Sequence, residues 1–322
     1  MKKFILKLLS IVGGVFLLEL GLLELVPVGK NDYLFEYNKK MELLKSTPSP
    51  KVIVVGGSSV AFNTLSPMIK DSLGCNVVNF GLHAGIGSRL PINDIKPFIK
   101  QGDIVIITIE YGDFFTSGEG EVPTLTSMMV YKNWQGWEYL NYGQWKNVLY
   151  GIPKIAYSNL RRLLSYPINK TWSTTNISDD TFQYCSLGFN QWGDEISHFN
   201  YKSCALIAND YYNNHRVINH EFVDFINESC DYIEEHGGKV IMMPPACLSD
   251  YVRHENNNIM FIERVLDGIG FPYLISPSDM MLDKEYLFDS KYHCNYQGAL
   301  INTKRIIESL RSVEPFLKNY HE

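Results

Sequence analysis

The sequence contains no run of more than two consecutive basic residues, and its formal net charge is −6. Proteins that bind nucleic acid cluster Lys and Arg against the phosphate backbone, so we expect no nucleic-acid partner. The sequence also lacks any C-x-x-C pair, which argues against a zinc ribbon or a thioredoxin-type redox motif. No set of His, Cys, Asp or Glu residues has metal-ligand spacing, and no cofactor is implied.

The composition is that of a folded globular protein, with 45% apolar and 20% charged residues in a chain of 322. The even number of cysteines permits disulfides, but a chain of this length can bury a core without them. We therefore expect free, mostly buried thiols at Cys75, Cys185, Cys204, Cys230, Cys247 and Cys294.

The first 27 residues contain an apolar stretch preceded by Lys2, Lys3 and Lys7. A signal-anchor helix over 4–26 has the length needed to cross a bilayer, and Glu19 and Glu24 fall near its outer end. A cleaved signal peptide fits the stretch 8–18 less well, because no small-residue cleavage site follows. A soluble amphipathic helix is the third alternative. The anchor interpretation predicts a membrane-bound protein whose bulk is extracytoplasmic, in the periplasm or at the cell surface.

The pattern after residue 50 alternates short β-branched runs with amphipathic segments. Strands are expected at 51–55, 76–79, 103–109, 239–243 and 272–275, with a final helix over 296–313. Such alternation predicts an α/β fold with a parallel sheet and right-handed crossovers. We expect a stalk over 28–50 with a short helix around 33–44, one α/β domain over 51–322, and an insertion over about 114–215 that carries all five Trp residues.

Two polar loops follow predicted strands, where ligands of parallel sheets bind. Gly56 and Gly57 precede Ser58 and Ser59 after the first strand, and a serine exposed there suits a nucleophile. The loop is not a Walker motif, since no Lys follows the glycines, and it is not G-x-S-x-G. A turn that only caps a helix is the simpler alternative.

The second loop lies near the C-terminus and brings a carboxylate and an imidazole close together in sequence. Asp289 precedes His293 by four residues, so the acid can hold the tautomer of a histidine that acts as a base. A surface histidine beside a helix start is the alternative for this loop.

Together the two loops resemble the SGNH/GDSL hydrolase superfamily, whose chains open with G-D-S after the first strand and end with D-x-x-H before a glycine. The segment from Gly56 to Ser58 matches the first block with Gly57 in place of Asp, and the segment from His293 through Asn295 to Gly298 matches the tail of the last block. The resemblance is closest to membrane-anchored SGNH-like proteins of bacterial cell-surface polysaccharide systems, which open with G-G-S. It implies a three-layer sandwich with a five-stranded, parallel, flavodoxin-like sheet.

The resemblance also assigns roles. Ser58 takes the place of the nucleophile, with Ser59 as its rival, and His293 takes that of the base. Asp289 becomes the orienting acid, although the spacing D-x-x-x-H is one residue longer than usual and Ser290 stands where the family has Asp. Gly85, with Gly81 as the alternative, supplies an oxyanion N–H.

The third block of the family, G-x-N-D, is altered in this chain. The sequence reads Glu110-Tyr111-Gly112-Asp113, so an oxyanion-binding Asn is missing. Glu110 either enters the site as a substrate-binding or hydrogen-bond-donating group, or turns away to bond backbone groups of the insertion. The insertion adds Asn190, Trp192 and Asp194 as possible sugar-binding residues, with a structural loop as the alternative.

These features predict serine-dependent ester hydrolysis or O-acyl (acetyl) transfer on a cell-surface glycan, with an acylated carbohydrate as substrate and the membrane as a partner through the N-terminal helix. The alternative is a non-catalytic glycan-binding or polysaccharide-assembly factor on a degenerate SGNH fold. Whether the chain is an enzyme, and whether it is an esterase or a transferase, stays open at this point.

Overall fold

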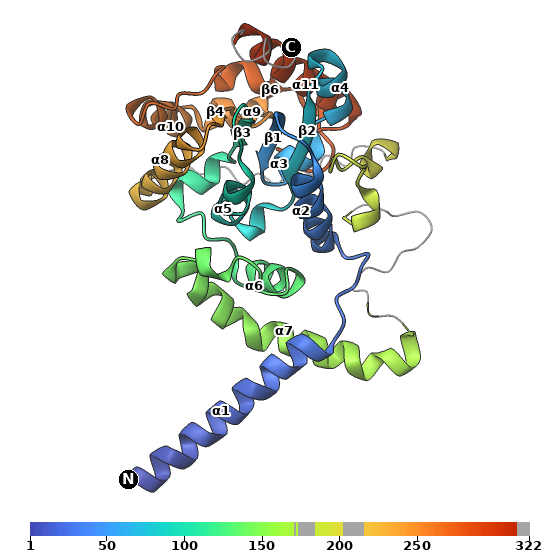
Figure 1. The fold of residues 1–322 in the computed structure, drawn as a ribbon, viewed down its shortest axis with the longest axis vertical. Helices are drawn as coiled ribbons and strands as arrows, with labels where there is room; N and C mark the ends of the chain where they lie inside the picture. The colour runs from blue at the N-terminus through green and yellow to red at the C-terminus, as the bar shows by residue number, and fades with distance from the viewer. Residues whose placement is uncertain (171, 173–183, 202–215, 314–322) are drawn as a thin grey trace.

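A parallel four-stranded sheet forms the centre of the chain in the computed structural model, which describes residues 1–170, 172, 184–201 and 216–313 (Figure 1). The strand order is β2-β1-β3-β4. The strands are β1 (Lys51–Gly56), β2 (Asn76–Gly81), β3 (Ile104–Thr108) and β4 (Lys239–Met242). Four of the five predicted strands and the α/β class are therefore confirmed.

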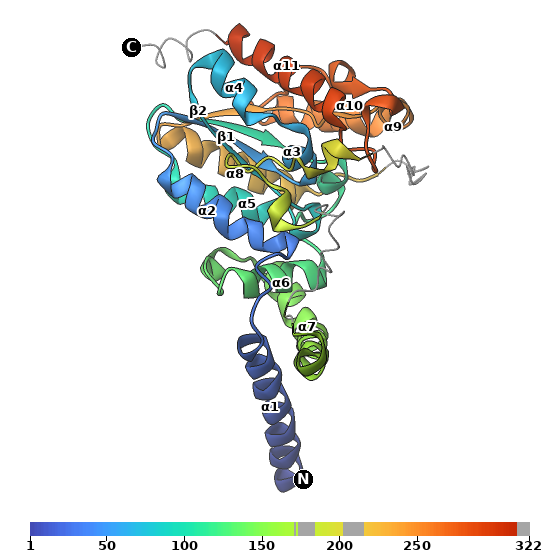
Figure 2. The same cartoon turned by 90° about the vertical axis from the view of Figure 1, so that its right-hand side faces the viewer.

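Alternate residues of each strand face opposite sides of the sheet and enter two separate cores. Ile53 and Val55 belong to the larger core, whereas Val52 and Val54 belong to the smaller one. Helices cover both faces in the side view (Figure 2). One side carries α4 (Ser66–Leu73) and α11 (Tyr296–Ser312), and the other carries α2 (Glu36–Ser46), α5 (Arg89–Ile95) and α8 (His220–Glu235).

The predicted fifth strand at 272–275 is wrong. Tyr273 makes only an isolated parallel bridge to Met242, through a hydrogen bond of 2.9 Å from Leu274 N–H to the Met242 carbonyl. Pro272 has no N–H to donate, and Ser276-Pro277 ends the run, so the segment is too short for a ladder. A second small sheet instead pairs β5 (Cys247–Leu248) with β6 (Met281–Leu282).

The N-terminal helix α1 (Lys2–Leu25) extends away from the rest of the chain in both views (Figures 1 and 2). Its most apolar stretch of 18 residues has a mean hydropathy of 2.1 and is not buried in the rest of the chain. The segment expected to be a stalk contains its expected short helix as α2, and this helix buries Tyr37 and Leu44 in the larger core. The buried Lys40 Nζ of α2 also donates to the carbonyls of Asn79 and Gly193. Residues 36–46 are thus part of the α/β domain rather than a free linker.

The insertion contains two helices that its sequence pattern did not reveal, α6 (Val122–Tyr131) and the long α7 (Tyr142–Asn169). They pack side by side between the sheet domain and α1 (Figure 1). Asn141 caps α7 in a capping box with Gln144. The remaining helices are α3 (Ser58–Asn63), α9 (Ser249–His254) and α10 (Asn256–Gly268), joined by short 3-10 turns.

The prediction about cysteines holds for the described residues. Cys75, Cys185, Cys230, Cys247 and Cys294 are all free and buried. Burial raises the pKa of the Cys75 thiol to about 11 and that of Cys230 to about 12, so these thiols stay protonated at neutral pH. Cys204 lies outside the described residues.

Candidate active site

The turn from β1 into α3 presents Ser58 at the carboxyl edge of the sheet. Gly56 is required there, since a Cβ at this position would lie 2.3 Å from the Thr108 carbonyl oxygen and 2.6 Å from Val60 Cγ2. Gly57 then precedes Ser58, the first residue of α3. The first N–H groups of a helix have no partner within it, and the chain supplies one for Ser59, whose N–H donates to Glu110 Oε1 at 3.4 Å.

The loop between residues 288 and 293 folds back on itself and turns two side chains to the same side. Phe288 N–H donates to the His293 carbonyl at 2.8 Å, which closes the loop. Ser290 Oγ accepts the N–H groups of Tyr292 and His293 at 3.2 and 3.1 Å. This turn absorbs the extra residue of the D-x-x-x-H spacing, because Ser290 stabilises the backbone while Asp289 reaches the imidazole.

Ser58, His293 and Asp289 form a continuous hydrogen-bonded chain. Ser58 Oγ lies 2.9 Å from His293 Nε2, and His293 Nδ1 lies 2.8 Å from Asp289 Oδ1. His293 is only 8% exposed, so its imidazole is largely shielded from water. Asn63 holds this loop on α3, because its Nδ2 donates to the Tyr292 carbonyl and its Oδ1 accepts Cys294 N–H, both at 2.8 Å. The arrangement can remove a proton from the Ser58 hydroxyl.

Tyr184 is a site residue that sequence reasoning missed. Its hydroxyl donates to Asp289 Oδ2 and lies 3.3 Å from His293 Nδ1. Partial burial favours the neutral form of Asp289, but hydrogen bonds from His293 and Tyr184 and the charge of His293 outweigh it and lower the pKa of Asp289. Asp289 therefore stays ionised. Tyr184 belongs to the insertion, 105 residues away, and no motif marks it.

The two glycines expected to supply an oxyanion N–H both have that group engaged. Gly85 N–H donates to His83 Nδ1 at 2.8 Å. Gly81 N–H donates to Asn79 Oδ1 at 3.0 Å, and Gly81 is buried against Val60. Rotation of the His83 side chain would free the N–H of Gly85. The N–H of Gly81 has no such release, because Gly81 is the last residue of β2 and is buried.

The side chain of Glu110 turns toward the loop that contains Ser58 and not toward the insertion. Its Oε1 accepts the N–H of Ser59. A Cβ placed on Gly57 would lie 3.1 Å from the same oxygen, so the carboxyl occupies the space beside Gly57. Burial raises the pKa of Glu110, against the lowering effects of the charge on His293 and the bonds with Ser59. Burial likewise raises the pKa of the nearby Asp113 to about 7. A hydrogen bond from Ser88 to the carboxylate opposes this upward shift, and the charge of Glu110 adds to it.

Asn190 and Asp194 lie in a buried network rather than on an open face. Asp194 Oδ1 accepts Ser66 Oγ at 2.6 Å and Asn79 Nδ2 at 2.9 Å, and Oδ2 accepts Asn190 Nδ2 at 2.9 Å. The Trp192 carbonyl accepts Asn79 N–H at 3.0 Å, which covers the outer edge of β2. This loop therefore covers the edge of the sheet. Of the three predicted sugar-binding residues, only Trp192 has a half-exposed side chain outside the hydrogen-bond network.

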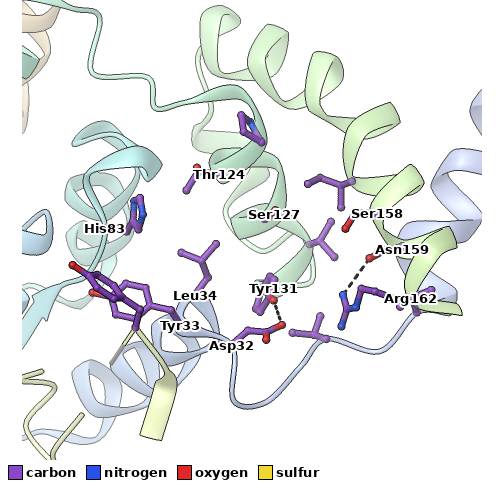
Figure 3. A pocket seen from close by; sticks show the side chains of 16 residues that line it. Asp32, Tyr33, Leu34, His83, Thr124, Ser127, Tyr131, Ser158, Asn159 and Arg162 are labelled. Atoms are coloured by element: carbon purple, nitrogen blue, oxygen red, sulfur yellow. Dashed lines mark hydrogen bonds between the residues drawn. The ribbon is translucent and has the colours of Figure 1, made fainter. Parts of the chain in front are cut away.

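A cavity of about 400 Å³ lies between the segment 26–34, α6 and α7. His83 and Tyr33 lie on one side of it, and Asn159 and Arg162 of α7 lie on the opposite side (Figure 3). Tyr184 also lines the cavity and contacts both Asp289 and His293, so the cavity lies next to the Ser58–His293 pair.

No family model, curated protein or solved structure matches this chain in the three comparisons. Among the described residues no group of three or more His, Cys, Asp or Glu side chains is arranged to hold a metal ion.

Proposed function

We propose that the chain uses Ser58 as a nucleophile in ester hydrolysis or O-acyl (acetyl) transfer on a cell-surface glycan. The observation that supports this most strongly is the relay from Ser58 Oγ through His293 to Asp289, with distances of 2.9 and 2.8 Å. Ser58 lies 235 residues from His293 in sequence, yet it meets His293 and Asp289 in the order required for proton transfer. The choice of a glycan, and of a three-layer, SGNH-like domain, comes from the sequence resemblance.

The proposed reaction has two halves. Ser58 Oγ attacks the ester carbonyl while His293 Nε2 takes the hydroxyl proton, and the resulting tetrahedral intermediate collapses as His293 returns that proton to the leaving alkoxide. In the second half, His293 deprotonates water or a sugar hydroxyl, which attacks the acyl group on Ser58 and releases the serine. Asp289 stays ionised and stabilises the imidazolium in both halves.

The oxyanion would be held by groups that follow the carboxyl ends of β1, β2 and β3. Ser58 N–H is the first of α3, and Gly85 N–H becomes available when His83 rotates. A protonated Glu110 carboxyl adds a donor in place of the missing Asn, which agrees with its raised pKa and its position beside Gly57. Binding of an ester would thus change the partner of His83.

Labelling with a fluorophosphonate ester probe tests the proposal. The full chain in detergent is the suitable material, since a fragment beginning near residue 46 would remove α2 from the core. We expect labelling of the parent protein and of Ser59→Ala, and none of Ser58→Ala. Labelling that persists in Ser58→Ala would refute the assignment of the nucleophile.

A non-catalytic glycan-binding or assembly factor is the second candidate. It is favoured by one observation, that the N–H groups of both Gly85 and Gly81 are engaged. This candidate predicts no probe labelling and no turnover of an activated acetyl ester. It predicts instead that the glycan raises the midpoint temperature of thermal unfolding. Turnover that Ser58→Ala abolishes would exclude it.

We also propose that α1 is a retained membrane anchor with the α/β domain outside the cytoplasm. The support is its length, its hydropathy and the absence of a small-residue cleavage site. Mass spectrometry of the protein from membranes should yield a peptide covering residues 8–30. A mature N-terminus near residue 27 would show cleavage instead.

A further inference from the structure

The long helix α7 is apolar on its outward face as well as on its buried one. It buries Val148, Ile152 and Ala156 together with Gln144 and Asn159, yet the exposed fractions of Leu164 and Ile168 are 69% and 83%. With about 3.6 residues per turn, the other exposed apolar and aromatic side chains of its middle part lie on the same side of the helix as these two: Leu149, Tyr150, Tyr157 and Leu160. A helix of a water-soluble domain keeps its outward face polar, so this outward face requires an apolar occupant.

The position of α7 indicates which occupant. α7 runs across the end of α1 nearest the sheet domain, and the free length of α1 continues beyond it (Figures 1 and 2). Asn159 Nδ2 donates to the Leu22 carbonyl at 3.1 Å, and Ile152 packs with Leu23 of α1. The outward face of α7 therefore continues the apolar surface of the helix proposed to enter the bilayer.

The length of α1 agrees with this placement. The residues of α1 before its contact with α7, 2–19, span about 27 Å at about 1.5 Å per residue, close to the roughly 30 Å of the hydrocarbon core. Glu24 comes after this span, and its carboxylate accepts Trp134 Nε1–H at 3.1 Å. The point where α1 leaves the hydrocarbon thus coincides with the level of α7.

The charges of α7 fit a lipid surface better than a second protein. The helix contains no acidic residue, and Lys146, Lys154 and Arg161 are exposed along it at intervals of eight and seven residues. Exposed tyrosines between these cations complete the pattern of helices that lie at the boundary between headgroups and acyl chains. Two copies of this helix face to face would bring like charges together.

We propose that α7 lies flat in the outer interface of the membrane that α1 crosses, with its exposed apolar face among the lipid acyl chains and its cations at anionic headgroups. The proposal goes beyond the proposed catalytic function and does not depend on it, although it rests on α1 as an anchor. It places the cavity between α7 and Tyr184 directly above the headgroups.

Fluorescence quenching in lipid tests the placement. The full chain, in a Cys204→Ser background, receives one cysteine at Tyr157 or at Leu164 and an environment-sensitive label, and is reconstituted in anionic vesicles with spin-labelled headgroups. The matched control is Phe261→Cys, an exposed apolar position on α10 far from α1 (Figure 1). We expect quenching at the two α7 positions at least about twice that of the control, because interfacial helices lie about 5–10 Å deep.

Each other outcome overturns the proposal. Equal quenching at Tyr157→Cys, Leu164→Cys and Phe261→Cys would mean that α7 stands clear of the lipid. Disulfide cross-linking of two chains through Tyr157→Cys, without quenching, would make this face a contact between copies. Failure of the chain to co-float with vesicles would remove the anchor as well. None of these results depends on Ser58 chemistry, so failure of the catalytic proposal remains distinguishable.

Discussion

The ring of Phe62 stacks on the imidazole of His293, with ring centroids 4.2 Å apart and planes inclined by 12°. Phe62 lies four residues after Ser58 on α3, so one short helix carries both Ser58 and the surface against which the imidazole of His293 rests. Ser58 and Asp289 bond the two nitrogens of the imidazole, and Phe62 restricts its tilt. We infer that Phe62 is a positioning residue.

Replacement of Phe62 by Leu should lower kcat about 10-fold or more while changing KM little, because a misplaced base costs rate rather than binding. The variant should also lose about 1–2 kcal/mol of unfolding free energy from the smaller buried side chain. The matched control is Phe80→Leu, since Phe80 is equally buried but packs on Tyr37. An equal fall in kcat for both variants, measured with an activated acetyl ester, would contradict a positioning role.

Asp289→Asn should reduce kcat by about 10³–10⁴-fold, because the amide favours the wrong tautomer of His293. Tyr184→Phe removes only one hydrogen bond to the Asp289 carboxylate, so we expect a reduction of about 10-fold or less. Steady-state rates of both variants with the same ester provide the measurement. A Tyr184→Phe effect as large as that of Asp289→Asn would instead identify Tyr184 as part of the proton relay.

Glu110→Gln tests the hydrogen-bond donor. The carboxyl donates only while protonated, and burial raises its pKa, so activity of the parent enzyme should fall as the pH rises through that raised pKa. The amide in the variant donates at every pH, and this decline should disappear. A variant with reduced thermal stability and an unchanged pH profile would show that Glu110 serves only the backbone of Ser59.

Asp113→Asn tests the linkage of stability to pH. The unfolded carboxyl loses its proton near pH 3.9, whereas the native one keeps it to about pH 7, so the native state binds more protons between these values. Stability of the parent protein should therefore fall as the pH rises through this window. The Asn variant accepts from Ser88 without ionising, and its urea midpoint should fall less between about pH 4 and about pH 7. Identical slopes would contradict the raised pKa.

Asp194→Asn separates a structural role from sugar binding. The amide replaces an oxygen that accepts hydrogen bonds within a buried network, so we expect a loss of about 3 kcal/mol or more of unfolding free energy. The rate per folded molecule should stay the same with a glycan ester. A raised KM at unchanged stability would restore the sugar-binding interpretation.

Local sequence patterns were sufficient for most of the sheet and for the position of Ser58. Ser58 follows a continuous β-branched run, and the carboxyl ends of parallel strands share one edge, so its place at that edge could be inferred from the local sequence. The short loop with Asp289 and His293 could be paired with Ser58 only through the family resemblance. The N-terminal apolar helix was equally accessible, because length and hydropathy alone define it.

Long-range packing decided the rest. The insertion helix α7 was missed because apolar residues lie on both its buried and its exposed faces, and because Gly151, Pro153 and Pro167 interrupt its pattern. The segment 272–275 has strand propensity, yet its flanking prolines leave a single bridge to Met242.

The sequence by itself determined which residues are able to do chemistry: a serine after a glycine turn, and an acid and a histidine four residues apart. The tertiary structure decided how these residues are supported. The hydroxyl of Tyr184 bonds Asp289 from 105 residues away, and Glu110 bonds the backbone next to Ser58. The carboxylate of Asp194 is held in a buried hydrogen-bond network. The physical reason is that periodicity records only whether a side chain faces the core, whereas the partner of a buried polar group depends on which distant segments the fold brings together.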